Sequence, residues 1–293
     1  MRKLVAVSLM FAAAVAAAAV AQEATDPYAA VDAAWLHRSD GQKDGWADPA
    51  VAKRIDDTAR AALKAHPGEL EAAWRALRAA YFVGEMSATT RDDKQAAFAQ
   101  VKPLYDRFWP VLVRHVEQAT GERFKHLDPA QQARALADMP GAKEFVFWSA
   151  ACWGKWGLAY GKWKAARQGV ARKVRDLAEI VVAMDESFEF AGGHRILGRL
   201  HEVSPRIPFI TGFIKRSLAL ENLKRAVEIA PQYGQNQLFL AEAEHDLGTK
   251  AEQENAPQRL KKLIESAPLP GYEIEGASTR REARELLASW EGK

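Results

Sequence analysis

The amino-acid sequence predicts an all-α protein in which helical hairpins follow one another along the chain. Three observations lead to this fold class. Apolar residues recur three and four positions apart through long alanine-rich segments, which is the period of one face of an α-helix. Short stretches rich in Pro, Gly and Asp separate these segments. A short apolar run that resembles a strand occurs within 204–213, but no second strand is evident beside it.

The first element is a secretory signal. Residues 1–21 begin with two basic residues, continue as an apolar stretch broken only by Ser8, and end in the small-residue sequence AVA. We expect cleavage there and export of residues 22–293 to the periplasm as one all-helical domain. The alternative is a membrane anchor, but the stretch is shorter than the roughly 20 residues that a spanning helix needs. The only cysteine, Cys152, lies far from this site, so no lipid-attachment cysteine precedes the domain.

After the signal, the spacing of apolar residues predicts a succession of helices with loops between them. The expected helices span 28–38, 49–65, 69–84, 92–120, 129–137, 142–166, 169–185, 191–203, 214–230, 235–247, 252–266 and 278–290. With one cysteine, no disulfide can form within the chain, so the hydrophobic core must stabilise these helices.

Charge argues against several partners. Without residues 1–21, 39 basic residues face 38 acidic ones, and the two signs are interspersed as on solvated helix faces. No run of basic residues of the kind that binds nucleic acid or a membrane surface is evident, so we expect no nucleic-acid partner. No metal-ligand pattern and no phosphate-binding loop is present, so we expect neither a metal nor a cofactor.

Internal repeats predict how the helices are arranged. A tetratricopeptide repeat (TPR) is a helical hairpin of about 34 residues with small, apolar and Pro positions at fixed places. Between Gly192 and Pro231 these places are occupied by Leu197, Gly198, His201, Ala219, Leu223, Ala226 and Pro231. Ala62 and Pro67 end an earlier hairpin, and Trp74, Leu77 and Tyr81 begin the next. The sequence thus favours TPR-like repeats in an α-α superhelix; an ordinary helical bundle is the alternative.

Several longer segments resemble one family. They are WLHRSDG (35–41), EAAWRALRAAYFVGE (71–85), FVFWSAACWGKWGLAYG (145–161), ESFEFAGGHRILGRLHEVSP (186–205) and ENLKRAVEIAPQYGQNQLFLAEAE (221–244). The chain resembles the T component of tripartite ATP-independent periplasmic (TRAP) transporters over nearly all of its expected mature length. The resemblance implies a periplasmic, TPR-like protein that forms a homo-oligomer, a trimer in the known member. It also implies an apolar pore through each protomer and docking to the substrate-binding protein of the transporter.

The chain departs from that family in two places. The characterised relative is anchored by a lipid, whereas this chain lacks the cysteine for one. Segment 98–120 also differs, since Pro103 and Pro110 predict a kinked helix or a loop there. A second function therefore stays open, a general TPR scaffold that binds peptides of a cell-envelope complex. An enzyme is the weakest reading, because no nucleophile and base, or pair of carboxylates, can be assigned to one site.

The segment 142–166 supplies most of the candidate site. On a helical wheel one face collects the aromatic side chains, and the opposite face carries Ala150, Gly154, Gly157, Gly161 and Ala165, which predicts close approach of another backbone. The aromatic face is interpreted either as core or as the wall of a cavity for a small apolar or organic-acid solute. Arg195 and Arg199 would bind its carboxylate or, alternatively, pair with nearby Glu. The candidate ligand-binding or pore-lining residues are Phe145, Trp148, Trp153, Trp156, Tyr160, Trp163, Arg195 and Arg199.

Overall fold

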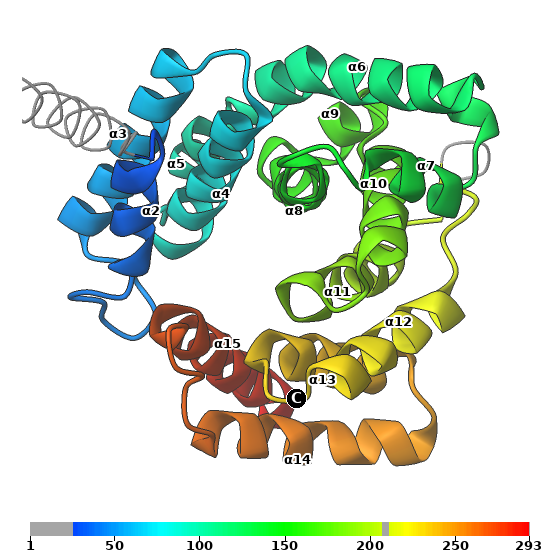
Figure 1. Cartoon of the computed structure of the whole chain (residues 1–293). Coiled ribbons are helices and arrows are strands. Elements are labelled where there is room, and N and C mark those ends of the chain that lie inside the picture. The colour runs from blue at the N-terminus through cyan, green and yellow to red at the C-terminus, as the bar shows by residue number, and fades with distance from the viewer. Residues whose placement is uncertain (1–25, 207–210, 293) are drawn as a thin grey trace, which may run out of the picture.

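The computed structural model describes residues 26–206 and 211–292, and this part of the chain is all-α with no strand. The helices form a ring of hairpins with α8 inside it (Figure 1). The first half comprises α2 (Ala29–Leu36), α3 (Pro49–Ala65), α4 (Leu70–Met86), α5 (Arg91–Phe98), α6 (Val101–Thr120), α7 (Pro129–Leu136) and α8 (Ala142–Tyr160). The second half comprises α9 (Lys162–Arg167), α10 (Val170–Met184), α11 (Phe188–Val203), α12 (Arg216–Ile229), α13 (Gly234–Leu247), α14 (Lys250–Glu265) and α15 (Glu273–Glu291). The predicted fold class is confirmed; the predicted signal lies outside the described residues.

Side-chain caps set some of the helix starts. The Asp48 side chain accepts hydrogen bonds from the backbone N–H groups of Ala50 and Val51, and Pro49 occupies the first helical position of α3. Thr90 and Thr249 begin α5 and α14 with capping boxes. These caps satisfy backbone donors that have no partner inside the helix.

The core is built around α8. This helix packs against α4, α6 and α10, and side chains without exposed surface fill the space between them, among them Leu77, Leu112, Phe145 and Ile180. Smaller cores lie under α2 to α4 and between α13, α14 and α15. The core is therefore distributed along the row of hairpins, as expected for repeats.

Two of the expected helices are interrupted. The expected helix 92–120 is divided at Ala99 and Gln100 into α5 and α6. Pro110 lies inside a continuous α6, so neither the predicted kink nor a loop is needed at that residue. The expected helix 142–166 is wrong as one element, because Gly161 adopts φ 91° and ψ 161° and separates α8 from α9. That backbone conformation is open to glycine and to almost no other residue.

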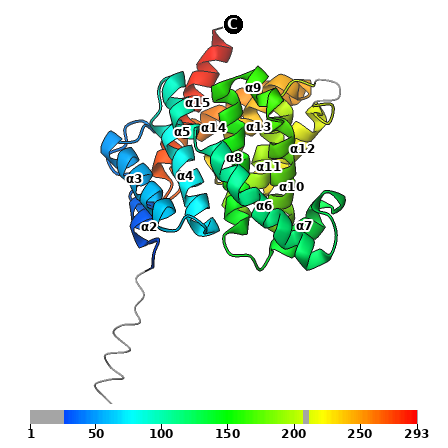
Figure 2. The same cartoon turned by 90° about the horizontal axis from the view of Figure 1, so that it is seen from above.

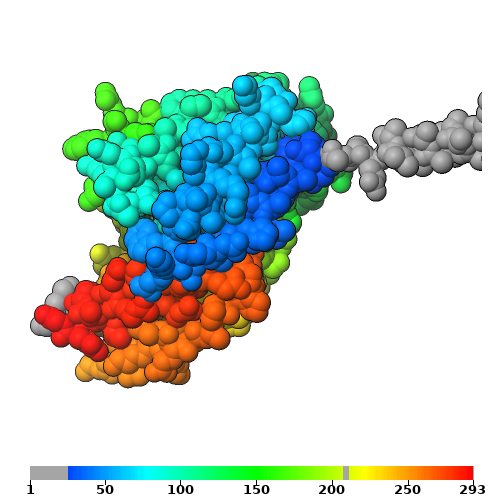
Figure 3. All heavy atoms as spheres, turned by 90° about the vertical axis from the view of Figure 1, so that its left-hand side faces the viewer, coloured from blue at the N-terminus to red at the C-terminus, as the bar shows by residue number. Residues whose placement is uncertain are grey.

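The ring closes where α15 meets the segment between α2 and α3 (Figure 3). Arg38 donates from Nε to Glu275 at 2.6 Å and also hydrogen-bonds the carbonyl of Gly271. Gly45 lies so close to Ser278 that an added Cβ would overlap the Ser278 backbone. Contacts between the first and last hairpins thus hold the ring shut. No described helix meets the length and apolarity needed to cross a bilayer.

Candidate functional site

The predicted aromatic face of α8 from Phe145 to Trp156 is buried in the core, and its rings contact different neighbours. Phe145 and Trp153 are fully buried, and Trp156 stacks on Tyr160 with ring centroids 4.4 Å apart. Trp148 instead turns toward the N-terminal hairpins and meets the rings of Tyr81 and Trp35, at 5.6 and 6.4 Å.

Trp163 does not belong to this face. It lies on α9, beyond the Gly161 turn, and is 88% exposed.

The predicted small-residue ridge does not explain the helical glycines of α8. A Cβ at Gly154 would meet nothing within 4 Å, and one at Gly157 would meet the Val170 side chain at 3.2 Å. Close approach occurs elsewhere, in α11, where a Cβ at Gly198 would lie 2.5 Å from Leu223 Cγ of α12. A small residue therefore lets two helices approach closely in the predicted α11–α12 hairpin. No such approach of another backbone occurs at the glycines of α8.

The two predicted arginines already have partners. Arg199 forms ion pairs at 2.7 Å with both Glu202 and Glu242, which is the alternative that the sequence left open. Arg195 donates to the backbone carbonyls of Glu189 and Phe190 and to Asn236 Oδ1, at 3.0 to 3.2 Å. Arg195 therefore holds the backbone at the start of α11.

The backbone that Arg195 holds is strained. Glu189, Phe190 and Ala191 all have φ between 49° and 60°, a left-handed conformation that costs roughly 1–2 kcal/mol per residue for an L-amino acid. Asn236 Nδ2 also donates to the Phe190 carbonyl, at 3.0 Å. Three consecutive strained residues fixed by two buried side chains turn the start of α11 toward the inside of the ring, and such strain is often found at functional sites.

Charged side chains from five parts of the chain converge inside the ring. We call this set the central charged cluster, and it consists of Arg38, Arg78, Glu85, Lys155, Glu189, Arg195, Glu275 and Glu282. Its members come from α4, α8, α11, α15 and the segment after α2, which surround the middle of the ring in Figure 1. Aromatic rings accompany it, including Trp35, Tyr81, Trp148, Tyr233 and Tyr272.

Glu189 is the carboxylate of this cluster without a close partner. Burial raises its pKa, against the opposing charges of Arg195 and Arg78. Within the described residues, its carboxylate makes no hydrogen bond or ion pair. A guest with hydrogen-bond donors would therefore find an unused acceptor at this position.

Arg78 is the cation of the cluster whose hydrogen-bond donors are mostly unused. Desolvation lowers its pKa to about 10, although Asp32 opposes the change. Its guanidinium lies over the rings of Trp35 and Trp74, 4.2 and 4.7 Å from their centroids. Among the described residues it hydrogen-bonds only Asp32, at 3.0 Å, so most of its five N–H donors are unused.

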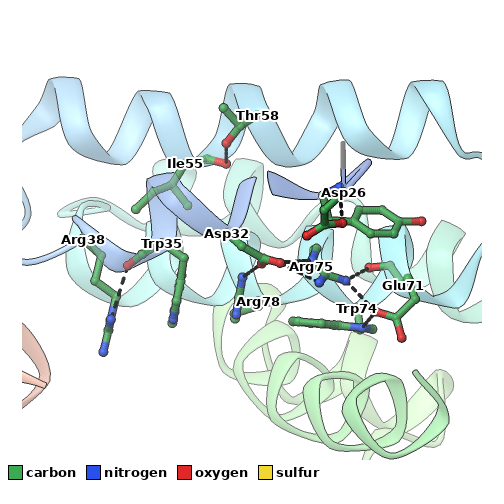
Figure 4. A network of polar contacts seen from close by, with 11 residues as sticks. Asp26, Asp32, Trp35, Arg38, Ile55, Thr58, Glu71, Trp74, Arg75 and Arg78 are labelled. Carbon is green, nitrogen blue, oxygen red and sulfur yellow. Dashed lines mark hydrogen bonds and ion pairs between the residues drawn. The ribbon is translucent and has the colours of Figure 1, made fainter. Parts of the chain in front are cut away.

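Asp32 orients Arg78 through a network in the first hairpins (Figure 4). Its carboxylate lies between Arg75 and Arg78 and accepts from both, with Arg75 Nη2 at 2.6 Å. Arg75 also pairs with Glu71, which accepts from the indole N–H of Trp74 at 2.9 Å. This network holds the Arg78 guanidinium in place, and the cluster carboxylate whose charge acts on it is Glu189.

The other end of the cluster is Glu85, Lys155 and Glu282. Lys155 pairs with Glu85, and burial raises the pKa of Glu282 although the positive charge of Lys155 lowers it. Glu282 is nevertheless exposed to water. A small hollow beside Tyr233, Tyr272 and Glu275 holds about 30 Å³, enough for a water molecule.

A larger groove lies in the last hairpins. It encloses about 670 Å³ between α13 and α14 and is lined by polar side chains that include Gln237, Asn255, Gln258 and Lys262. This volume matches that of a small-molecule or peptide subsite. None of the predicted site residues lines it.

No protein-family model matches the chain, and no curated protein matches it at a significant level. Trp148 and Arg195 are among the residues that the sequence predicted, whereas Arg38, Arg78, Glu189 and Glu275 are not. The sequence feature that could have indicated these residues is a charged side chain within an otherwise apolar helix, such as Arg78 inside LRAAYF (77–82). Which of these polar residues meet depends on ring closure, and helical periodicity does not contain that information.

Proposed function

We propose that the chain is a non-enzymatic periplasmic protein of the TRAP T-component type. It docks the substrate-binding protein of a TRAP transporter and holds or relays an apolar solute that carries a carboxylate. The observation that carries this proposal is the central charged cluster. Burying several charges costs free energy, and apolar side chains would fill the ring at lower cost. A ligand that uses these charges gives a reason for their presence.

The chemistry of the cluster suits such a solute. The unused N–H donors of Arg78 match a carboxylate. The Trp35 ring beside its guanidinium, and the Trp148 ring that contacts Trp35, offer apolar contact. Arg78 thus takes the role that the sequence assigned to Arg195 or Arg199, whose donors are occupied.

One experiment tests the solute and the arginine together. Octanoate and octanol, which share a chain and differ in charge, are titrated into residues 22–293 while tryptophan fluorescence is followed. Octanoate should bind about ten-fold more tightly than octanol, and Arg78→Gln should remove that preference, since one charged hydrogen bond contributes about 1.5 kcal/mol or more. Exposed Arg54→Gln on α3 is the control. Equal affinities for the two probes, or an unchanged preference in Arg78→Gln, would disprove the solute proposal.

Docking is tested separately. The mature chain is mixed with the purified substrate-binding protein encoded beside TRAP membrane subunits in the same genome, and the complex is sought by size-exclusion chromatography. A stable complex supports the transporter association.

A general TPR scaffold is the second candidate, favoured by the polar groove between α13 and α14. Gln258→Ala and Asn255→Ala would weaken peptide binding there and leave octanoate binding unchanged.

A further inference from the structure

An exposed aromatic and basic surface lies where α8 ends and α9 begins. Leu158 is 69% exposed and Trp163 is 88% exposed, and both rank among the few large apolar side chains of the described residues that face solvent. Neither the Trp163 ring nor the Leu158 side chain belongs to the hydrophobic core. Tryptophan at such a place is typical of surfaces that enter the interface between membrane and water.

The same surface is positively charged. Between Glu144 and Asp176 the sequence has no acidic residue. Four exposed cations follow on α9 and in the first turn of α10, and none of them forms an ion pair within the described part of the chain. We call the six residues the α9 patch: Leu158, Lys162, Trp163, Lys164, Arg167 and Arg172.

The acidic groups of the neighbouring elements do not cancel this charge. Arg91 at the start of α5 donates to the Ala159 carbonyl at 3.1 Å, so α5 adjoins the end of α8. The two acidic residues that follow, Asp92 and Asp93, are balanced by Arg91 and Lys94. Asp176 is paired with Arg175 at 2.5 Å. The four cations of the α9 patch therefore remain in excess.

We propose that the α9 patch binds an anionic phospholipid surface, with Trp163 and Leu158 at the level of the headgroups. Charge complementarity supports this occupant, because clustered Lys and Arg beside a tryptophan are attracted to negatively charged lipid. The size of the patch argues against a protein partner. A stable protein interface buries about 800 Å² on each side, far more than the two apolar side chains of the patch provide, one at the end of α8 and one on the six-residue helix α9.

Position agrees with this assignment. In Figure 2, α9 lies at the end of the molecule that also carries the C-terminal end of α15, and α2 begins toward the opposite end. The α9 patch can therefore touch a membrane without covering the segment where the described chain starts. The sequence shows no basic run because one to four uncharged residues separate successive cations of the patch; the absence of acidic residues was the usable signal.

The test is co-sedimentation of residues 22–293 with phosphatidylcholine vesicles, with and without phosphatidylglycerol. We expect binding only to the anionic vesicles, and loss of that binding at high salt. The triple variant Lys162→Gln, Lys164→Gln, Arg167→Gln should bind about ten-fold or more weakly, because each cation near the surface adds attraction. Equal binding to both vesicle types, or no effect of the triple variant, would overturn the proposal.

A matched charge control is the triple variant Arg54→Gln, Lys64→Gln, Lys250→Gln. These cations are also exposed but lie on α3 and α14, so vesicle binding should not change. A loss as large as that of the α9 patch variant would mean that total charge, and not the patch, determines binding, and would overturn the proposal.

Insertion of the ring has its own readout. Brominated phosphatidylglycerol should quench the fluorescence of the wild type more than that of Trp163→Phe. Leu36→Ala, which removes another exposed apolar side chain on α2, should behave as wild type. Salt-sensitive binding to an acidic protein without binding to vesicles would instead assign the α9 patch to a protein partner.

Discussion

Glu202 is a residue whose charge costs the folded state free energy. Its side chain is 5% exposed, and burial raises its pKa from 4.5 to about 7, although Arg199 lowers it. The folded protein therefore holds this proton more tightly than the unfolded chain. The contribution of Glu202 to stability is complete below pH 4.5 and is lost as the pH rises through about 7.

Glu202→Gln, which keeps the neutral form, should remove this dependence. Relative to the variant, the wild type should lose up to about 3 kcal/mol of unfolding free energy between pH 5 and pH 8, from about 1.4 kcal/mol per pKa unit. Urea unfolding at both values measures it. Exposed Glu265→Gln is the control. Parallel pH profiles of Glu202→Gln and wild type would contradict the expectation.

Two tryptophans seven positions apart have opposite surroundings. Trp156 is 7% exposed and lies between Trp153 and Tyr160, whereas Trp163 is 88% exposed. Trp156→Ala should destabilise the protein by about 3–5 kcal/mol, because it leaves a cavity in the core. Trp163→Ala should change stability by less than about 0.5 kcal/mol. Denaturant titration compares the two, and similar losses would show that the assignment of core and surface is incorrect.

At this scale the sequence predicted some residues and not others. The aromatic character of α8 and its burial follow from periodicity, whereas Arg195 was predicted only as a cation able to bind a carboxylate. Periodicity did not reveal that the N–H donors of Arg195 bind backbone carbonyls of the strained segment. The left-handed conformation of Glu189 and Phe190 has no sequence signature. A glycine would have been the expected sign of such a turn, but this chain uses none there.

At the scale of the element, two glycines within helices have opposite surroundings: one is in tight contact with a neighbouring helix and the other is open. Gly198 of α11 faces Leu223 of α12, so Gly198→Ala should destabilise the hairpin by about 1–3 kcal/mol through overpacking. Gly154 of α8 has nothing within 4 Å of an added Cβ, so Gly154→Ala should stabilise by up to about 1 kcal/mol through helix propensity. Thermal unfolding distinguishes the two signs. Destabilisation by Gly154→Ala would restore the predicted close approach on the back of α8.

The existence of the helices could be predicted, and their interruptions could not. Alanine-rich periodicity continues through Ala99 and Gln100, where α5 ends and α6 begins, so no local signal divides them. At Gly161 the residue type permits a break, but Gly154 and Gly157 in the same helix permit one equally. Packing of neighbours decides which glycine is used, and this information is not local.

Ring closure belongs to the whole molecule. The hydrogen bond between Arg38 and Glu275 joins residues 237 positions apart, as do the contacts of Arg281 with the Asp44 carbonyl. Repeat hairpins are specified by nearest neighbours, which leaves the superhelix free to be open or closed. Closure brings Glu275 and Glu282 of α15 to Arg38 and Lys155, and so completes the central charged cluster. The site thus depends on a contact that no single repeat encodes.

Gly45 is the residue at which closure can be tested. It has φ 79° and touches the backbone of Ser278, so Gly45→Ala both strains the turn and pushes α15 away. Hydrogen exchange should speed up in the first half of α15 and in the segment between α2 and α3, while α8 and α10 keep their protection. Octanoate binding should weaken with it, because loss of the Glu275 contact frees Arg38, which packs on the same Trp35 ring as Arg78. Gly68→Ala is the control, since an added Cβ there meets nothing within 4 Å. Unchanged exchange in α15 would mean that the first and last hairpins are held together independently of Gly45, and faster exchange throughout the chain would mean that the ring does not open as a separate step.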